Sequence, residues 1–185
     1  MRAGPEGLMD HAPMVTARLT LRPPGTEDTR AIFAAISSDA EVTRFVGWPR
    51  HTQLAQTEQF LAFARAEWER WPAGPLLMVS RADGQIVGST GLAFETPYRA
   101  STGYVLARHA WGQGFASEAL DVVAALAEAL EVRRLYAHCH VDHAASVRVL
   151  ERCGFRREGV LKRYLIFPNL GDPQPQDVFC YARIR

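Results

Sequence analysis

The sequence predicts an α+β fold in which helices flank a mixed, mostly antiparallel central sheet. Strand-like segments follow one another through the middle of the chain, and Asp83-Gly84 between two of them is a strong hairpin signal. Apolar residues then recur at the helical period from Ala116 to Leu130. Because this long helix lies between two strand-like segments, it can return the chain so that the two strands pair in parallel.

The N-terminal part is expected to hold one strand followed by helices. Val15–Arg22 alternates apolar with polar residues well enough for a strand. Thr26 is expected to cap a helix that runs to about Ser37. With this start, Glu27 and Asp28 lie in the first turn, where the helix dipole favours acidic side chains. Further helices are expected over residues 40–45 and from a Thr52 cap to about Trp71.

The rest of the chain alternates strands with two helices. Strands are expected at residues 76–80, 86–94, 101–107, 134–140, 157–167 and 177–184, with a short helix at 145–152 after the long one. Gly154 follows the short helix and suits the left-handed position at which many helices end.

Length and composition indicate one ordinary globular domain. The chain has 185 residues, of which 48% are hydrophobic and 22% charged, and this is enough to build a single core. Residues 1–14 contain glycine, proline and polar residues and are expected to form a flexible N-terminal arm, with residues 15–185 as the domain. A net charge of +1 gives no sign of a nucleic-acid partner.

Cysteine usage and hydropathy point to a reducing, cytoplasmic setting. The three cysteines, Cys139, Cys153 and Cys180, are odd in number, widely spaced and set among apolar residues, so we expect core packing and neither a disulfide framework nor a metal site. No apolar run approaches the roughly 18 residues of a membrane helix. Residues 1–16 also lack the pattern of a signal peptide, so no membrane association is expected.

A glycine-bearing turn, Trp111-Gly112-Gln113-Gly114-Phe115-Ala116, joins a strand to the long helix. The first N–H groups of a helix have no internal partner and carry partial positive charge, so such a turn can bind a phosphate. A dinucleotide fingerprint is disfavoured because the preceding strand belongs to an antiparallel meander, and no P-loop pattern is present. From the turn alone, a tight connection without a ligand stays equally open.

Two longer segments resemble the GNAT acetyltransferases. The segment Gly103–Leu120 is similar to their signature Gln/Arg-x-x-Gly-x-Gly/Ala, and Ala144–Phe155 followed by Glu158-Gly159 is similar to their second signature. Thr16–Arg22 and Gly47-Trp48-Pro49 also fit the branch that contains ribosomal-protein-alanine N-acetyltransferases. The resemblance covers about residues 15–183 and implies a GNAT fold whose central sheet is split at a parallel pair of strands.

The resemblance also implies where acetyl-CoA binds. The cosubstrate is expected in a V-shaped split between the strands around Val105 and Cys139, with no metal involved. The residues implied for binding are Tyr104, Val105 and Leu106 along the pantetheine arm and Gly112, Gln113, Gly114, Phe115, Ala116 and Ser117 at the pyrophosphate. Two positions depart from the family pattern. Trp111 replaces Gln or Arg, and His143 replaces an Asn that contacts pantetheine; His143 is expected either to donate a hydrogen bond there or to be an exposed loop residue.

Direct acyl transfer to an amine needs an oxyanion donor, an acid for the leaving thiolate and a neutral amine. The N–H of Leu106 is a candidate donor. Leu150 stands where many members have an acidic Tyr, so Ser146 is the candidate acid, with a helix cap as the alternative. Glu95 is the candidate base, acting through water, with a solvated carboxylate as the alternative. His109, His138 and His140 are further candidates.

The acceptor is expected to be a primary amine, either a protein N-terminus or a small molecule such as an antibiotic or a polyamine. The candidate acceptor contacts are Phe45, Trp48, Phe94, Tyr98 and, further on, Tyr164, each with core packing as the alternative. The sequence lacks an acidic cluster, and this disfavours polycationic aminoglycosides. A noncatalytic acyl-CoA-binding sensor is the alternative from another class, and either a monomer or a homodimer is compatible with the sequence.

Overall fold

The computed structural model describes residues 12–184, which fold around one eight-stranded sheet with the order β1-β2-β3-β4-β5-β6-β8-β7. The strands are β1 (Met14–Val15), β2 (Leu19–Arg22), β3 (Pro75–Ser80), β4 (Ile86–Thr96), β5 (Arg99–Leu106), β6 (Arg134–His140), β7 (Arg156–Leu165) and β8 (Gln176–Ile184). The helices are α1 (Thr29–Ile32), α2 (Leu54–Arg70), α3 (Phe115–Ala129) and α4 (Ala144–Arg152). The expected arm is largely residues 1–11, which lie outside the described residues, and Met14 already belongs to β1.

Strand pairing confirms the mixed sheet. Neighbouring strands are antiparallel throughout the described chain except β5 and β6, which pair in parallel over residues 99–101 and 134–136. The connection between them runs through α3, as the helical pattern after Gly114 predicts. The predicted α+β class, with one parallel pair inside a mostly antiparallel sheet, is therefore confirmed.

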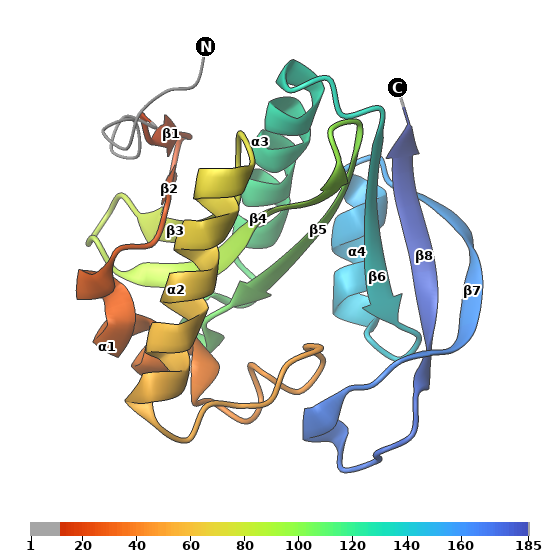
Figure 1. The fold of residues 1–185 in the computed structure, drawn as a ribbon, viewed down its shortest axis with the longest axis horizontal. Coiled ribbons are helices and arrows are strands. Elements are labelled where there is room, and N and C mark those ends of the chain that lie inside the picture. Colours follow the sequence, from red (N-terminus) through yellow and green to blue (C-terminus); the bar gives the residue numbers. More distant parts are fainter. Residues whose placement is uncertain (1–11, 185) are drawn as a thin grey trace.

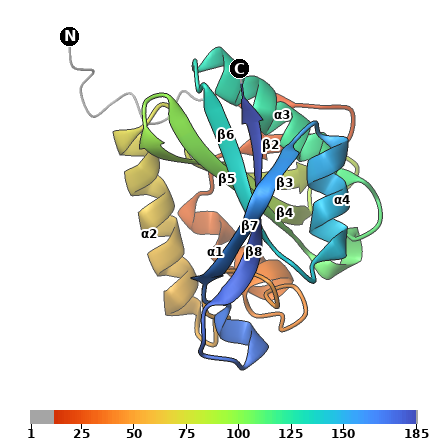
Figure 2. The ribbon, with the colours of Figure 1, turned by 90° about the vertical axis from the view of Figure 1, so that its right-hand side faces the viewer.

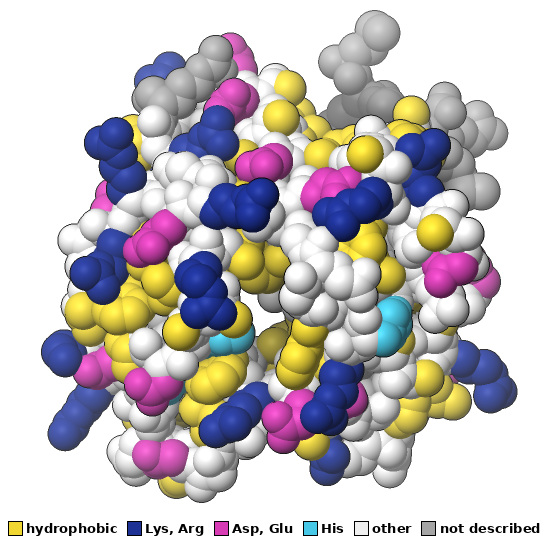
Figure 3. Space-filling view, turned by 180° about the vertical axis from the view of Figure 1, so that it is seen from behind, with side chains coloured by type: hydrophobic (Ala, Val, Ile, Leu, Met, Phe, Trp, Pro, Cys, Tyr) yellow, Lys and Arg dark blue, Asp and Glu magenta, His cyan; other side chains and the backbone are white. Residues whose placement is uncertain are grey.

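Helices cover both faces of the sheet. Helices α1 and α2 lie on one face, and α3 and α4 lie on the other (Figures 1 and 2). The predicted apolar face of α3 is buried against the sheet through Ala119, Leu120, Val123 and Ala127. Seen from the α3–α4 side, basic and acidic side chains are interspersed, and the surface is hollowed near its middle (Figure 3). No helix within residues 12–184 is long and apolar enough to cross a membrane.

The N-terminal elements differ in detail from those predicted. The strand expected over Val15–Arg22 is two short strands, β1 and β2. Gly25, and not Thr26, holds the cap position of the first helical segment, because the Asp28 carboxylate accepts the Gly25 N–H at 2.8 Å. Gln53, and not the predicted Thr52, holds the cap position of α2. The Gln56 side chain accepts the N–H groups of both Thr52 and Gln53.

Residues 40–45 form turns in place of the expected short helix. The Asp39 side chain accepts the backbone N–H groups of Glu41 and Val42 at 2.8 and 3.1 Å, and the Thr43 hydroxyl donates to the Asp39 carbonyl at 2.7 Å. Such local side-chain hydrogen bonds satisfy the backbone without a helix. The segment therefore follows the short-range chemistry of Asp39 more closely than its helical propensity.

Buried Asp28 makes an ion pair with half-buried Arg22 that should contribute to stability in acid. Arg22 donates from its two terminal nitrogens to the two Asp28 oxygens at 2.7 Å each, and the Asp28 side chain is 7% exposed. Burial alone would raise the pKa of Asp28, but hydrogen bonds from Arg22 and Gly25 outweigh burial and hold this pKa below its ordinary value. The pair therefore stabilises the fold fully above the unfolded-state pKa, about 3.9, and loses its effect as the pH falls through the folded-state pKa.

Asp28→Asn is expected to lower the free energy of unfolding by about 2 kcal/mol at neutral pH, because the half-buried Arg22 guanidinium loses its ionised partner. Urea titrations of both proteins between about pH 7 and pH 2 measure the effect. The difference in free energy of unfolding between wild type and Asp28→Asn should be constant above about pH 5 and should shrink in acid. A difference that stays constant down to the lowest pH would show that the charge of Asp28 contributes nothing.

Candidate active site

The site begins where β5 and β6 separate. Their pairing ends at Ser101 and Tyr136, and beyond it the two strands diverge toward their C-terminal ends (Figure 1). The Ala107 N–H donates to Val87 on β4 at 2.9 Å. Because antiparallel backbone groups alternate in direction, Val105 also faces β4, and the N–H and C=O groups of Tyr104 and Leu106 face the split. Of the three residues expected along the pantetheine arm, Tyr104 and Leu106 therefore have backbone groups that face the split, and Val105 does not.

The glycine turn follows at the end of β5. Gly112 and Gly114 have φ of 73° and 80°, in the left-handed region, and a Cβ added at Gly112 would meet no atom within 4 Å. Helix α3 begins at Phe115, and its first hydrogen bond is donated by Glu118 to Gly114 at 3.1 Å. The preceding amides of Phe115, Ala116 and Ser117 consequently have no acceptor within the helix.

Two side chains within the turn fix its shape. The Trp111 indole N–H donates to the Leu106 carbonyl at 2.9 Å, and the Gln113 amide donates to the His109 carbonyl at 2.7 Å. Trp111, which departs from the family pattern, thus ties the turn to the end of β5. Sequence patterns indicate the turn, but they do not reveal these two side-chain hydrogen bonds.

Helix α4 forms the opposite wall of the split. It begins at Ala144 with His143 in the cap position, so the alternative interpretation of Ser146 as a helix cap is wrong. The Ser146 hydroxyl instead lies 2.9 Å from the Tyr104 hydroxyl, which also lies 3.0 Å from the Ser146 carbonyl. Burial raises the pKa of Tyr104 far above its ordinary value, so this phenol stays protonated. A tyrosine of β5 therefore holds the candidate acid.

The cysteines near the split are free, buried thiols, as expected for core residues. Burial raises the pKa of Cys139 and Cys180, and it raises the pKa of Cys153 to about 11. The thiolate is the nucleophilic form of cysteine, so these thiols are poor nucleophiles at neutral pH. This chemistry suits direct transfer better than a thioester intermediate on the enzyme.

Aromatic and imidazole rings gather where β6 ends and α4 begins. Phe45 stacks on His143 with ring centroids 4.6 Å apart and lies 5.1 Å from His140, which meets Phe167 edge-on at 4.9 Å. His143 is thus half-buried, and the expectation of an exposed loop residue is wrong. Burial lowers the pKa of His143, with a smaller contribution from His140, so its imidazole is neutral near pH 7.

Asn169, which sequence reasoning missed, fixes the loop that carries Phe45 and Trp48. Its side-chain N–H₂ donates to the carbonyls of Thr43 and Trp48 at 2.7 and 2.9 Å, and its oxygen accepts the Arg50 N–H at 2.9 Å. These hydrogen bonds join the loop before α2 to the connection between β7 and β8. No sequence signal reveals such contacts, because they span more than a hundred residues of chain.

The candidate base Glu95 is held by two partners. Tyr136 donates its hydroxyl to one carboxylate oxygen, and Arg99 pairs with the other at 2.6 Å. His138 lies beside them, 5.2 Å from the Tyr136 ring and 4.8 Å from the Tyr164 ring. Burial lowers the pKa of His138 despite the attraction of Glu95, so this imidazole is also neutral near pH 7.

Two of the expected acceptor contacts do not reach this region. Phe94 is 8% exposed and stacks on Trp71 at 5.3 Å, so it belongs to the core beneath α2. Tyr98 is exposed in the turn between β4 and β5, at the end of the sheet opposite the loop that carries Phe45 (Figure 1). Its backbone carbonyl binds the N–H groups of Arg133 and Arg134. We retain Phe45 and Trp48 as acceptor candidates and drop Phe94 and Tyr98.

The split strands, the glycine turn and the amide-rich start of α3 agree with what the comparisons show. Residues 18–156 match the family described as the acetyltransferase (GNAT) domain. The chain belongs to the GNAT acetyltransferase family. It is 33% identical, over 92% of its length and 96% of the relative's, to the uncharacterized N-acetyltransferase YoaA of Bacillus subtilis. The protein is therefore an N-acetyltransferase, which disfavours the sensor alternative.

Solved structures share the fold of this acetyltransferase. RimL, a ribosomal L7/L12 alpha-N-protein acetyltransferase solved with coenzyme A, has a TM-score of 0.80 and 25% identity over 92% of this chain and 96% of its own. Spermidine N-acetyltransferase from Vibrio cholerae, solved with CoA and spermine, has a TM-score of 0.77 and 18% identity over 91% and 96%. One fold thus serves enzymes with different acceptors, so the acceptor has to be inferred from the site.

Proposed function

We propose that the protein transfers an acetyl group directly from acetyl-CoA to the α-amino group of a protein or peptide, as a member of the branch that contains the ribosomal-protein acetyltransferases. The amides of residues 112–117 hold the pyrophosphate, and the backbones of Tyr104 and Leu106 pair with the pantetheine arm like an added strand. His143, at the start of α4, lies beside the same arm. Residues 15–185 work as one catalytic domain.

Each residue has a defined task in the proposed transfer. The neutral amine attacks the thioester carbon, and the Leu106 N–H donates to the oxyanion that forms. The amine then loses a proton to Glu95 through a chain of water molecules, since Glu95 lies at the β4–β5 hairpin, several residues along β5 from Leu106. The Tyr136 hydroxyl and Arg99 hold the Glu95 carboxylate in place. As the C–S bond breaks, the Ser146 hydroxyl protonates the leaving sulfur and takes a proton back from water, while the proton accepted by Glu95 is released to solvent.

The residues on the acceptor side favour an α-amine as the acceptor. The retained candidates there, Phe45 and Trp48, carry uncharged aromatic rings, and the carboxylate of Glu95 is already paired with Arg99. A polyamine or aminoglycoside would need several unpaired carboxylates to replace the water around its charges. An α-amine has a pKa near 8, against about 10.4 for lysine, so a sizeable fraction is neutral without a strong base. The similarity to RimL supports the same choice.

A substrate panel tests the proposal. With acetyl-CoA fixed, we expect kcat/KM for peptides with a free N-terminus to exceed that for spermidine or an aminoglycoside by at least about tenfold. An N-terminally blocked peptide with an internal lysine is the matched control, and mass spectrometry of the product locates the acetyl group. Equal or faster acetylation of spermidine would contradict the assignment to α-amines while leaving the acetyltransferase activity intact.

A further inference from the structure

We propose that Arg18, just before β2, is a positioning residue that sets the orientation of the acetyl-CoA turn. The inference deepens the proposed function and rests on the turn 112–117 being the pyrophosphate site. Arg18 belongs to a different part of the chain from the turn, and the signature of the turn does not include it.

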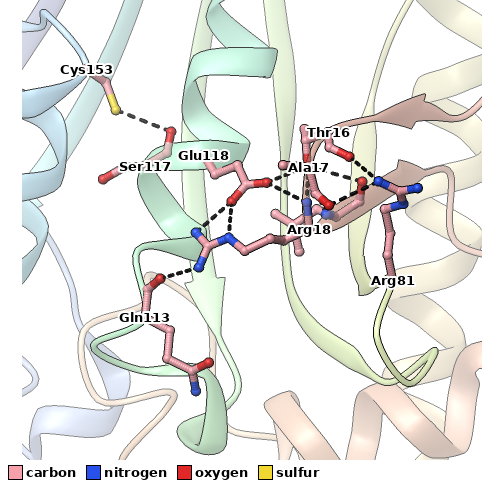
Figure 4. A network of polar contacts seen from close by, with 9 residues as sticks. Thr16, Ala17, Arg18, Arg81, Gln113, Ser117, Glu118 and Cys153 are labelled. Atoms are coloured by element: carbon pink, nitrogen blue, oxygen red, sulfur yellow. Dashed lines mark hydrogen bonds and ion pairs between the residues drawn. The ribbon is translucent and has the colours of Figure 1, made fainter.

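Arg18 connects β2 to the turn and to the first turn of α3 (Figure 4). Its Nη1 donates to the Gln113 carbonyl at 2.8 Å, and its Nε and Nη2 bind one Glu118 oxygen at 2.7 and 2.6 Å. The guanidinium also lies over the Phe115 ring, 4.6 Å from its centroid. One planar group thus contacts the turn at Gln113 and Phe115 and the adjoining first turn of α3 at Glu118.

The bond to the Gln113 carbonyl determines which way the next amide points. A peptide unit is planar and trans, so its C=O and N–H point in opposite directions. With the Gln113 oxygen held toward Arg18, the Gly114 N–H is directed away from Arg18, and in the proposed site this is the side that receives the phosphates. The reversed peptide would direct a carbonyl oxygen at the ligand and repel it.

The turn needs such a hold because glycine makes the reversal easy. Gly114 has φ of 80°, and glycine occupies positive and negative φ about equally well. A rotation of the peptide between Gln113 and Gly114 therefore meets little steric resistance from Gly114. The hydrogen bond from Arg18 selects one orientation before the ligand arrives, and this reduces the ordering required for binding.

Glu118 in turn holds Arg18. One of its oxygens accepts the Thr16 hydroxyl at 2.6 Å and the Arg18 N–H at 3.0 Å. Burial would raise the pKa of Glu118, but the hydrogen bonds from Thr16 and Arg18 lower it overall, so the carboxylate stays ionised. Because Glu118 neutralises Arg18, the proposed role is geometric, and lysine at position 18, which lacks the planar fork, cannot replace it.

Arg81 offers a matched control. It donates to the carbonyls of Thr16 and Ala17 at 2.8 and 3.0 Å, so it braces the same segment from the other side and has no described bond to the turn (Figure 4). Arg81→Ala removes a similar pair of hydrogen bonds and the same charge. An effect that arises only from loosening residues 16–18 should therefore appear in both Arg18→Ala and Arg81→Ala.

Arg18→Ala is expected to raise the KM for acetyl-CoA and the Kd for CoA about tenfold, the factor expected for losing one charge-assisted hydrogen bond. The kcat and the KM for an accepted amine should stay within about twofold, and Arg81→Ala should leave all four constants near wild type. Steady-state kinetics and calorimetric titration with CoA provide the constants, and thermal melting compares the stability of the two variants.

Arg18→Lys and Glu118→Gln extend the test should Arg18→Ala not fold. Both are expected to raise the Kd for CoA in the same direction, with Arg18→Lys close to Arg18→Ala. Unchanged CoA affinity in the folded variants, or equal losses in Arg18 and Arg81 variants, would overturn the role of Arg18. Failure of the wild-type protein itself to bind CoA would instead overturn the pyrophosphate site, so the two failures are distinguishable.

Discussion

Gly91→Ala is expected to lower the free energy of unfolding by about 3 kcal/mol or more, from backbone strain together with overpacking. Gly91 lies in β4 with φ of 145°, a conformation that residues with a side chain rarely adopt. A Cβ at this position would lie 2.4 Å from the Gly74 carbonyl oxygen and 2.8 Å from the Pro75 Cα. Both are backbone atoms, so relief requires β3 to move away from β4.

Gly103 is the matched control, because it is the register partner of Gly91 on β5. A Cβ at Gly103 would meet no atom within 4 Å, so Gly103→Ala should change stability by no more than about 0.5 kcal/mol. Urea titrations of the three proteins without ligand make the comparison. Equal stability of the two variants would show that the close approach of Gly74 to Gly91 imposes no constraint.

Local patterns sufficed for the elements whose burial follows a regular period. The strand expected over residues 134–140 matches β6, and the long helix after Gly114 matches α3 closely, because alternation and the 3.6-residue period each continue through the whole element. The family signatures then identified the turn and the split. In these regions the sequence pattern and the tertiary environment favour the same secondary structure.

Prediction was poorest where distant segments decide the structure. Phe94 and Phe45 are both aromatic residues near loops, but Trp71 packs over Phe94, whereas Phe45 meets His143 beside the split. Ser146 was predicted as the candidate acid with a helix cap as the alternative, and the pattern did not reveal that its hydroxyl lies 2.9 Å from that of Tyr104, 42 residues earlier. The roles of Asn169 and Arg18 could not be predicted for the same reason, because each residue acts through contacts that only the fold creates.

Ser146→Ala is expected to lower kcat about a hundredfold while leaving the KM for acetyl-CoA near wild type, the loss expected when a general acid is removed. Tyr104→Phe should lower kcat less, because the tyrosine orients the Ser146 hydroxyl and, with its pKa raised by burial, does not itself release a proton. Single-turnover and steady-state rates with an accepted peptide measure both effects.

The double variant separates orientation from an independent role. If Tyr104 acts through Ser146, then Tyr104→Phe should have almost no further effect on kcat in the Ser146→Ala background. Tyr181→Phe is the control, since the Tyr181 hydroxyl also reaches α4, donating to Glu151 at 2.9 Å, but does so from β8 and away from the split. Its loss should affect stability and spare kcat. Additive losses from Tyr104 and Ser146 would instead assign the tyrosine a contact of its own with the substrate.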